Sequence, residues 1–400
     1  MLDAFDRCRL HDDFQPVTEL GAYPYYRPVE ERLATGEVVV GGRVLVAAGS
    51  NDYLGLSADP RLKEAACRAI RALGTGTSGS RLVNGSLALH ERLEGRLAAF
   101  LGQEAAMVTP TGFLANLALS ALVGPRDTVL ADQLIHASLI DAVRLSRARL
   151  RRYRHNDLGH LERLLAGCDP AGAGLIITEG MFSTTGTLCD LPGTAALARR
   201  HGARLVLDGA HDIGLLGPGG RGAAEHHGLL PAVDLHTMAF SKCFGTTGGA
   251  VAGPEQIMVY LRHHARSMVF SAALSPSSTA AALAALDIVE AEPERRHRAL
   301  AAAARLRADL AGLGFGTGAS QTTIIPVHVG DVVLCCRLWR ELFEEGVFAT
   351  AMVPPSVPDG QALIRVSTTA LHTDAQLDRI ASAFAAAGRR LGLIPRTGRS

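Results

Sequence analysis

The chain has 400 residues, of which 48% are hydrophobic, 20% are charged and 43 are glycines. This length favours about two domains, and the composition is typical of a globular enzyme. The 40 basic and 39 acidic residues leave a net charge of +1, so the charge points neither to nucleic acid nor to an anionic membrane surface.

Cysteine usage and the N-terminal residues favour a cytoplasmic protein. The seven cysteines are scattered apart from Cys335 and Cys336, and none has the spacing of a zinc site or of a disulfide framework. Residues 1–14 mix four aspartates with two arginines, which is unlike a signal peptide. Gly, Pro, Asp or Arg interrupts each apolar run before it reaches the length of a membrane span. We therefore expect a cytoplasmic protein with no membrane span and no metal site.

The first 45 residues are typical of a lead-in segment and not of a domain. A short helical start precedes Tyr23-Pro-Tyr-Tyr-Arg-Pro28, and a strand-like Glu37–Val40 then breaks at two glycines. Within the first of these motifs, Arg27 stands between two prolines and beside three tyrosines. It either meets an extended or acidic substrate or stacks on an aromatic ring as a packing residue.

A glycine-rich loop follows in the region before the first expected sheet strand. Asn51-Asp-Tyr-Leu-Gly55 comes first, and a helix is expected from about Pro60 to Leu73. The loop, residues 74–85, fits neither a Walker motif nor a dinucleotide fingerprint, so its glycines do not imply a nucleotide phosphate. Leucines at four-residue spacing from Leu89 to Leu101 then predict a packing helix.

From Ala105 to Gly253 the sequence repeats a short strand, a loop and a helix. The expected strands cover residues 106–109, 127–131, 174–178, 204–208, 234–237 and 250–253. Near-continuous apolar strands that alternate with helices predict an α/β fold, with a mostly parallel sheet covered on both faces.

Polar residues follow the carboxyl ends of these strands, where ligands bind in such sheets. Thr111-Gly112-Phe113 follows the first strand and opens a helix expected to reach Leu122, whose free N–H groups would hold a phosphate. The later strands are followed by His136, Ser183, Asp208 and His211. Each has an ordinary structural explanation, such as a capping serine or a core histidine. Their recurrence at the same end of successive strands favours a site.

One lysine, Lys242, lies among small and apolar residues in the stretch from His236 to Gly249. It either caps a strand end at the surface or sits in a partly desolvated pocket, where an amine becomes a nucleophile for a carbonyl. A strand ending in Asp208, then His211, then a second strand and Lys242 is the layout of a pyridoxal phosphate site. In such a site the acid keeps the ring nitrogen protonated and the lysine holds the aldehyde as a Schiff base.

From about residue 291 the pattern changes to that of a small α+β domain. The expected elements are a long helix, a strand at 323–329, a helix at 334–345, a strand at 362–367 and a final helix. Thr373-Asp-Ala-Gln376 has the form of a capping box at the start of that helix. Arg365 interrupts an otherwise apolar strand, so it either grips a substrate carboxylate or forms a salt bridge at a domain interface.

Taken in order, these motifs resemble those of the α-oxoamine synthase family over about residues 20–390. The motifs are Asn51–Gly55, residues 74–85, Thr111–Phe113, His136, Asp208-Gly-Ala-His211, Ser241-Lys-Cys-Phe-Gly245 and Arg365–Thr373. The resemblance implies a fold-type I pyridoxal phosphate enzyme with a mostly parallel, seven-stranded type of sheet. It implies a homodimer with shared active sites and an acyltransferase that condenses an amino acid with an acyl thioester of coenzyme A or a carrier protein, with decarboxylation. The expected parts are an N-terminal segment (1–45), a cofactor-binding large domain (46–290) and a small domain (291–400).

Site roles follow from the resemblance, position by position. Lys242 resembles the Schiff-base lysine, Asp208 the partner of the pyridine nitrogen, and His136 the residue that stacks on the ring. The resemblance further implies that His211 bonds the ring hydroxyl, that Ser183 lies near the cofactor, and that Gly112 and Phe113 give N–H groups to the phosphate. The expected cofactor-binding set also includes Thr111 and Ser241, and the expected substrate-binding set is Asn51, Arg365 and Arg27.

The chain also departs from the family pattern at several positions. Ala239 and Ala273 stand where phosphate-binding hydroxyl groups are usual, and Ser241, Ser271 or Thr247 could substitute for them. Three further departures are Gly209, Thr184 and Thr185. The N-terminal tyrosine motif favours a specialised biosynthetic pathway, but neither the amino acid nor the acyl group is assigned. Another fold-type I activity, such as an aldolase or an aminotransferase, and a non-catalytic partner subunit remain as alternatives.

Overall fold

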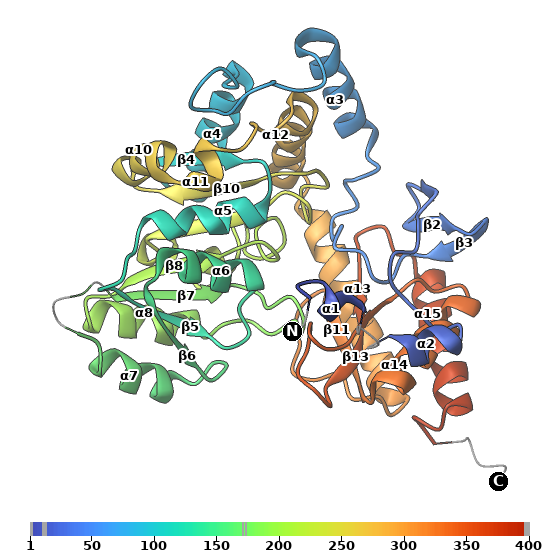
Figure 1. Ribbon diagram of the computed structural model, residues 1–400. Coiled ribbons are helices and arrows are strands. Elements are labelled where there is room, and N and C mark those ends of the chain that lie inside the picture. Colours follow the sequence, from blue (N-terminus) through green and yellow to red (C-terminus); the bar gives the residue numbers. More distant parts are fainter. Residues whose placement is uncertain (1–2, 10–13, 170–171, 173, 396–400) are drawn as a thin grey trace. The chain divides into compact units, whose positions relative to one another are not determined.

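The structure is a computed structural model that describes residues 3–9, 14–169, 172 and 174–395 (Figure 1). The chain forms two compact units. The larger unit contains residues 51–301 and 369–371, and the smaller contains residues 1–50, 302–368 and 372–400. None of the helices in the described ranges combines the length and apolar character that a membrane span requires.

The larger unit is built on a seven-stranded sheet with the order β4-β10-β9-β8-β7-β5-β6. Its strands are β4 (Ala105–Thr109), β5 (Thr128–Asp132), β6 (Arg149–Tyr153), β7 (Gly174–Glu179), β8 (Arg204–Asp208), β9 (Leu235–Ala239) and β10 (Gly249–Gly253). Only β10 runs antiparallel to its neighbours, β4 and β9. This arrangement confirms the predicted α/β class with a mostly parallel sheet.

Helices cover both faces of this sheet (Figure 1). The helices that follow its strands are α5 (Gly112–Ala118), α6 (Ala137–Ser146), α7 (Leu158–Ala166), α8 (Leu191–Arg200), α9 (Ala223–His226), α10 (Glu255–His264) and α11 (Arg266–Val269). The chain advances from β4 through β5 to β6 and then reverses through β7 to β8. Right-handed crossovers therefore place α5 and α6 on one face, where they contact each other, and α7 and α8 on the other. At the other end of the sheet, α4 (Ala88–Leu101) packs on β4 and β10, and α12 (Pro276–Ala291) contacts α4 and α3 (Pro60–Leu73).

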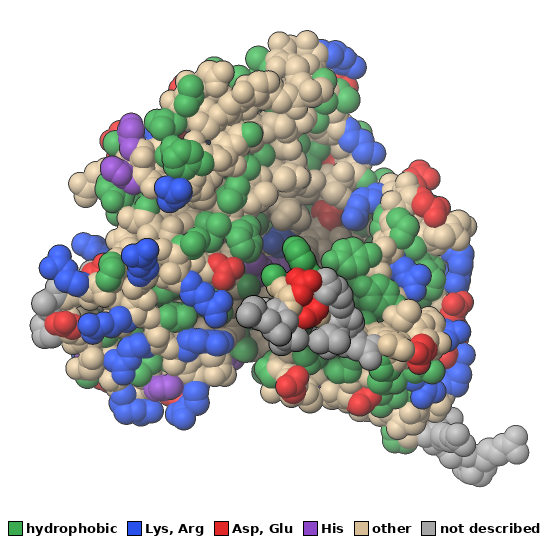
Figure 2. Space-filling view, viewed as in Figure 1, with side chains coloured by type: hydrophobic (Ala, Val, Ile, Leu, Met, Phe, Trp, Pro, Cys, Tyr) green, Lys and Arg blue, Asp and Glu red, His purple; other side chains and the backbone are tan. Residues whose placement is uncertain are grey.

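The edge strand β6 is the one member of the sheet that the sequence pattern did not predict. Three of its five residues are arginines, and only Tyr153 is buried. An edge strand does not need two apolar faces, and charged side chains there disfavour pairing with another sheet. Lys and Arg side chains gather on the surface over β5, β6 and α7 (Figure 2). The apolar alternation that reveals central strands is therefore missing from β6.

The smaller unit contains an antiparallel sheet with the order β11-β13-β12. Its elements are β11 (Ile324–Gly330), β12 (Thr350–Met352), β13 (Ala362–Ser367), α14 (Val332–Glu344) and α15 (Asp374–Arg390), together with the end of α13 (Pro293–Gly312). Thr373 and Gln376 form the predicted capping box at the start of α15. The apolar face of this sheet packs with α13, α14 and α15 around Ile325, Ile364 and Phe384.

The N-terminal residues belong to this smaller unit. They form α1 (Asp6–Arg9), α2 (Gln15–Glu19) and the antiparallel strands β1 (Glu31–Arg32), β2 (Glu37–Val40) and β3 (Arg43–Val46). Val46 N–H donates to the Gly346 carbonyl at 2.9 Å, and Phe348 N–H donates to the Val46 carbonyl at 2.8 Å. The chain thus divides at residues 50 and 301, whereas the sequence pattern placed boundaries at 45 and 290.

Candidate active site

A cavity of about 220 Å³ in the larger unit brings together eight of the residues that the sequence pattern singled out. They are Thr111, Gly112, Phe113, His136, Asp208, His211, Ser241 and Lys242. The cavity lies beyond the carboxyl ends of β4, β5, β8 and β9, because each of these strands is followed by one or more of its lining residues. Parallel strands present their carboxyl ends at one edge of a sheet, so residues far apart in sequence meet there.

The loop that carries Lys242 turns tightly after β9. Gly245 N–H donates to the Lys242 carbonyl at 3.0 Å, and Gly245 has a φ of +60°. A Cβ atom at this position would lie 2.5 Å from the backbone nitrogen of Ser57, so no side chain fits. The glycine therefore allows the loop to pack on the Leu56–Ser57 backbone, and Lys242 remains half-buried at the cavity wall.

Asp208 ends β8 and is only 3% exposed. One carboxylate oxygen accepts a hydrogen bond from the Asn116 side-chain amide at 2.7 Å, and the other accepts from the Ala210 N–H at 2.9 Å. Glu179 lies directly opposite Asp208 in the register of β7 and β8. Burial, and then the negative charge of Asp208, raises the pKa of Glu179 well above its ordinary value. The Glu179 carboxyl group therefore keeps its proton to a higher pH than an exposed glutamate does.

His136 caps the N-terminus of α6 with its ring. Nδ1 accepts the Ser138 N–H at 3.2 Å and lies 2.7 Å from the Ser138 hydroxyl oxygen. The backbone N–H of His136 donates to the Glu179 carboxyl group. Desolvation by the surrounding protein lowers the pKa of His136, while the nearby Asp208 opposes this shift. The imidazole is therefore neutral at physiological pH.

His211 contacts the Asn51–Gly55 motif through Tyr53. The Tyr53 hydroxyl group lies 2.7 Å from Nδ1 of His211, and both side chains are buried. The same hydroxyl group donates a longer hydrogen bond to the Asn51 side-chain oxygen at 3.4 Å. The Asn51–Gly55 motif thus orients a histidine of the cavity, although Asn51 itself does not line it.

Comparisons with known proteins agree with this geometry. The family model described as aminotransferase class I and II matches residues 44–384. The chain is 41% identical over 367 residues to a serine palmitoyltransferase of Bacteriovorax stolpii, which covers 91% of this chain and 87% of the relative. It is 42% identical over 373 residues to an 8-amino-7-oxononanoate synthase of Symbiobacterium thermophilum, which covers 92% of this chain and 95% of the relative. This chain belongs to the α-oxoamine synthase family.

A solved structure supports the same membership at the level of the fold. A serine palmitoyltransferase from S. paucimobilis with bound PLP–myriocin aldimine superposes with a TM-score of 0.95 at 32% identity, covering 98% of this chain and 100% of the other. The two named activities are matched at nearly equal identity, 41% and 42%. Overall similarity therefore does not select a substrate for this α-oxoamine synthase.

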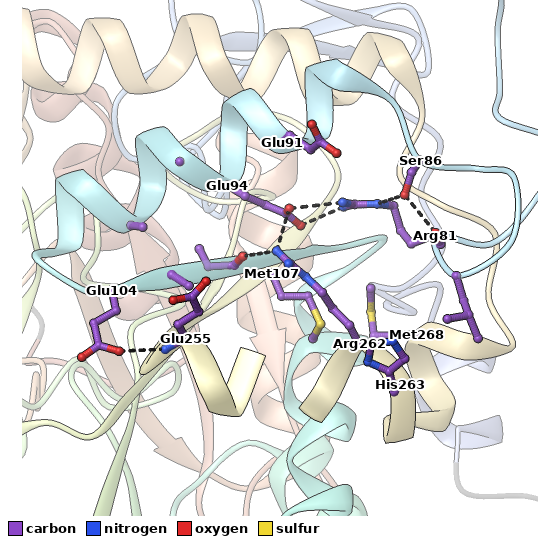
Figure 3. A pocket seen from close by; sticks show the side chains of 15 residues that line it. Arg81, Ser86, Glu91, Glu94, Glu104, Met107, Glu255, Arg262, His263 and Met268 are labelled. Atoms are coloured by element: carbon purple, nitrogen blue, oxygen red, sulfur yellow. Dashed lines mark hydrogen bonds and ion pairs between the residues drawn. The ribbon is translucent and has the colours of Figure 1, made fainter. Parts of the chain in front are cut away.

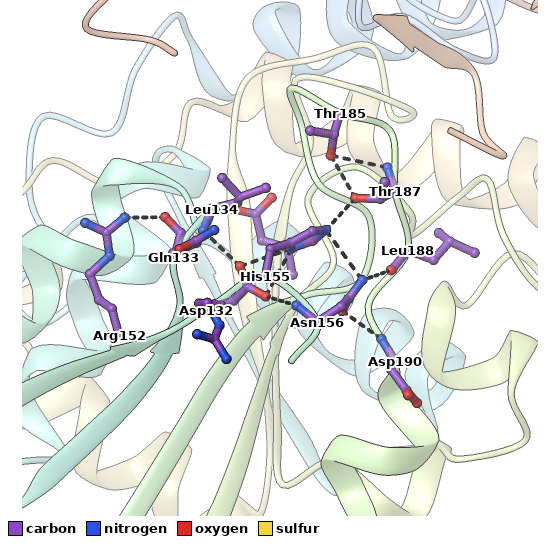
Figure 4. A network of polar contacts seen from close by, with 12 residues as sticks. Asp132, Gln133, Leu134, Arg152, His155, Asn156, Thr185, Thr187, Leu188 and Asp190 are labelled. Atoms are coloured by element: carbon purple, nitrogen blue, oxygen red, sulfur yellow. Dashed lines mark hydrogen bonds and ion pairs between the residues drawn. The ribbon is translucent and has the colours of Figure 1, made fainter. Parts of the chain in front are cut away.

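Ser183 lies in the loop after β7 and is absent from the cavity lining. Its N–H bonds the Glu179 carboxyl group, which does line the cavity. A polar network anchors the same loop to β5 (Figure 4). The His155 ring lies between Asp132, 3.1 Å from Nδ1, and the Thr187 hydroxyl group, 2.9 Å from Nε2. The loop of this α-oxoamine synthase is thus held beside the cavity through carboxyl groups at the ends of two neighbouring strands.

Arg365 and Arg27 belong to the smaller unit. Arg365 lies on β13 and is 6% exposed. Arg27 donates two hydrogen bonds to the Tyr23 carbonyl, at 3.2 and 2.7 Å, and its guanidinium carbon lies 5.6 Å from the centre of the Trp339 ring. Arg27 thus makes the aromatic contact that was one of its two interpretations.

A larger cavity of about 510 Å³ in the larger unit contains none of the predicted site residues (Figure 3). Its central acid, Glu94, is 4% exposed and accepts hydrogen bonds from Arg81 at 2.8 and 3.1 Å and from Arg262 at 3.0 Å. The Val108 N–H also donates to Glu94, at 2.9 Å. These donors already engage Glu94, and none of the residues that line this cavity is a lysine that could bind an aldehyde. Chemistry, not size, therefore identifies the smaller cavity as the candidate active site.

Three residues of the candidate site were not found from the sequence, namely Asn116, Ser138 and Glu179. Each lies close in sequence to a residue that was identified: Asn116 follows Thr111, Ser138 follows His136, and Glu179 ends the strand before Ser183. Glu179 had a signal, because an acid at the end of an apolar strand repeats the pattern of Asp208. Asn116 and Ser138 have no such signal, since both residue types are common near helix starts.

Proposed function

We propose that this chain is a pyridoxal 5'-phosphate-dependent acyltransferase that condenses a small α-amino acid with an acyl thioester. The product is an α-amino ketone, and carbon dioxide and a free thiol are released. The observation that carries this proposal is that Lys242 and Asp208 line one small cavity. The names of the relatives, serine palmitoyltransferase and 8-amino-7-oxononanoate synthase, support the same reaction class.

The cavity residues fit the cofactor by their chemistry. An amine, a buried carboxylate and a neutral imidazole converge on a space at the small end of ligand pockets. When bound, pyridoxal phosphate supplies an electron sink for the bonds of the amino acid's α-carbon. Asp208 holds the proton on the nitrogen of the cofactor ring. The buried groups that donate hydrogen bonds to its two carboxylate oxygens keep the Asp208 side chain oriented. His136 stacks on the ring, and His211, held by Tyr53, bonds the ring hydroxyl group.

Lys242 has two roles in the proposed reaction. Its amine binds the cofactor's aldehyde in the resting enzyme, and once the amino acid has displaced it, the freed amine takes the α-proton. The Glu179 carboxyl group accepts hydrogen bonds from two backbone N–H groups, those of His136 and Ser183, which hold it in place beside this site. Ser183, held through Glu179, lies near the cofactor in this proposal, behind the residues that line the cavity.

The phosphate is assigned to the start of α5. In this assignment the N–H groups of Gly112 and Phe113 bind the phosphate, and Thr111 and Ser241 line the same cavity. A Cβ atom on Gly112 would lie 2.5 Å from the Cβ of Ala239, so glycine is required where these two segments cross. Ser241 is exposed to the cavity and supplies a hydroxyl group that Ala239 lacks.

In this proposal, arginine side chains bind both substrates. The family resemblance assigns Arg365 and, separately, Asn51 to the carboxylate of the amino acid, and a planar guanidinium group matches a carboxylate. The acyl group is assigned to a cavity of about 310 Å³ in the smaller unit. Its walls include Tyr25, Tyr26, Trp339 and Phe348, and its charged lining residues are Arg27 and Arg32. This apolar lining with two cations suits an acyl chain that is joined to an anionic carrier.

A homodimer and a cytoplasmic location complete the proposal. Val83 is 80% exposed and Phe270 is 75% exposed. The segments that carry them lie together, because Ala273 N–H donates to the Gly79 carbonyl at 2.9 Å. Exposed apolar side chains on adjoining loops favour a second copy of the chain as their partner. The seven cysteines are all unpaired, which fits a reducing compartment.

Product analysis tests this function. Purified protein loaded with pyridoxal phosphate would be given a panel of amino acids with acyl-coenzyme A or acyl-carrier protein donors, and products would be identified by mass spectrometry. We expect one pair to yield an α-amino ketone, with one carbon dioxide and one thiol per turnover, and Lys242→Ala to abolish both the product and the visible band of lysine-bound cofactor. An amino acid converted without thiol release would instead indicate an aminotransferase or an aldolase. Protein that stays colourless would indicate a non-catalytic partner subunit.

A further inference from the structure

A chain of hydrogen bonds connects the ring of His136 to the carboxylate of Asp208 through two residues with no assigned role. Nδ1 of His136 lies 2.7 Å from the Ser138 hydroxyl oxygen. That oxygen accepts from the Asn116 side-chain amide at 2.9 Å, and the same amide nitrogen donates to Asp208 at 2.7 Å. Asn116 and Ser138 are 5% and 0% exposed, so solvent does not compete for these bonds.

The chemistry of the groups fixes which one donates and which one accepts in each of these hydrogen bonds. A carboxylate only accepts hydrogen bonds, so the NH₂ group of Asn116, and not its carbonyl oxygen, faces Asp208. The second hydrogen of that NH₂ group is donated to Ser138, which leaves the Ser138 hydroxyl hydrogen for His136. The Ser138 backbone N–H, which can only donate, also points at Nδ1 at 3.2 Å. Nδ1 therefore accepts two hydrogen bonds and carries no proton.

The opposite nitrogen of the ring then carries the only proton of the neutral imidazole. Nε2 makes no hydrogen bond within the described part of the chain, and the ring is exposed where it lines the cavity. The backbone of His136 is fixed as well, because its N–H donates to the buried Glu179. The ring thus has one nitrogen anchored to the protein and one N–H left for a ligand.

We propose that Asn116 and Ser138 are positioning residues that hold His136 in the neutral tautomer protonated on Nε2. In this tautomer the ring presents a hydrogen-bond donor, and not a base, to a carboxylate or carbonyl oxygen of the substrate. This inference rests on the proposed function, which places the cofactor and the amino acid at the cavity that His136 lines. In this arrangement the amine of Lys242 remains the group that takes the α-proton. The N–H of His136 orients the substrate oxygen that it contacts.

The tautomer can be read directly by NMR of protein labelled with ¹⁵N in its histidines, without any turnover. Loss of signals in His136→Asn identifies the ring nitrogens of His136. We expect Nε2 to be protonated and Nδ1 to be unprotonated at neutral pH, in both the cofactor-free and the loaded protein. Ser138→Ala removes one of the two donors to Nδ1, so the ratio of the two tautomers should fall roughly 3- to 10-fold.

Two further variants separate this role from a structural one. Ser138→Thr keeps the hydroxyl group and should restore the wild-type tautomer ratio. Ser120→Ala is the matched control, because among the described residues the Ser120 hydroxyl group donates to the Leu117 carbonyl alone, at 2.7 Å in the preceding turn. That control should leave the His136 signals unchanged. If Ser138→Ala does not fold, Ser138→Cys offers a weaker donor of similar size for the same measurement.

A double-mutant cycle links the tautomer to catalysis. Ser138→Ala should lower kcat/KM for the amino acid roughly 3- to 10-fold in the native background and leave it unchanged in His136→Asn, because the contact acts only through the imidazole. A proton on Nδ1 in the native protein, an unchanged tautomer ratio in Ser138→Ala, or additive effects in the cycle would each overturn the inference. Failure of the proposed function would look different, since the protein would then form no α-amino ketone while the NMR result stood.

Discussion

Asp212 provides a quantitative test of the electrostatics around the candidate site. It follows His211, is fully buried, and accepts the Ala223 N–H at 2.6 Å with one carboxyl oxygen. The other oxygen has no hydrogen-bond partner among the described residues. Burial raises the pKa of Asp212 from 3.8 to about 7, because there is too little donor contact to stabilise the charge. We predict that Asp212→Asn removes a pH-dependent loss of stability while keeping the acceptor for Ala223.

The sign follows from proton linkage. Below about pH 4 the carboxyl group is protonated in both the folded and the unfolded chain, and its full contribution to stability is present. As the pH rises toward 7, the folded protein keeps a proton that the unfolded chain releases, so stability is lost and the loss levels off above the folded pKa. A shift of about three pKa units corresponds to about 4 kcal/mol, of which roughly 2 to 3 kcal/mol falls between pH 5 and pH 8.

Urea unfolding of the two proteins at a series of pH values measures this pH-dependent contribution of Asp212 to the free energy of unfolding. The free energy of unfolding of the native protein should fall by roughly 2 to 3 kcal/mol more than that of Asp212→Asn between pH 5 and pH 8. Asp359→Asn, at an exposed aspartate, serves as the control and should parallel the native curve. Parallel curves for Asp212→Asn and the native protein would show that Asp212 is ionised in the folded state and would refute the reasoning.

Three further predictions concern single residues of the proposed machinery. Asp208→Asn should keep the visible band of bound cofactor but slow exchange of the amino acid's α-proton by about 100-fold or more, and native exchange rates in this variant would disprove the role of Asp208. Arg365→Lys should raise KM for the amino acid roughly 10- to 100-fold with a smaller effect on kcat, since lysine lacks the planar fork; an unchanged KM would remove Arg365 from the carboxylate site. Gly245→Ala should cost about 2 kcal/mol or more in thermal unfolding, because a Cβ atom there meets the Ser57 backbone at 2.5 Å. Gly228→Ala, at a φ of +67° with open space around it, should cost only about 1 kcal/mol, and equal losses at the two positions would mean that the close contact does not matter.

Much of the fold could be read from the chain because its signals are local. The central strands are almost entirely apolar, and a run such as Leu205–Leu207 is buried on both faces. The helix from Pro60 to Leu73 and the helix that follows Thr373 are each preceded by a residue whose side chain accepts a hydrogen bond from a free N–H group of the first turn. Such a cap depends only on adjacent residues. β6 was missed for the complementary reason that an edge strand tolerates arginines where a central strand cannot.

The residues of the candidate site likewise include some that local sequence patterns reveal and some that they do not. Lys242, Asp208, His136 and His211 were identified because each follows a recognisable strand in the expected order. Asn116, Ser138 and Glu179 were not, since their importance comes from partners that are distant in sequence. Asn116, for example, lies 92 positions from the carboxylate it orients. No pattern within one strand or helix indicates such a pairing.

The order of strands, glycines and polar residues along the chain was enough to predict an α/β sheet, a lysine and an acid beyond the carboxyl ends of its strands, and a family. Only the tertiary structure decided which polar groups bond each other, that burial raises the pKa of Glu179, and which donors face Nδ1 of His136. The reason is physical. Secondary structure and the order of loops depend on near neighbours, whereas protonation and hydrogen-bond direction depend on burial and on charges that the fold brings within a few ångströms.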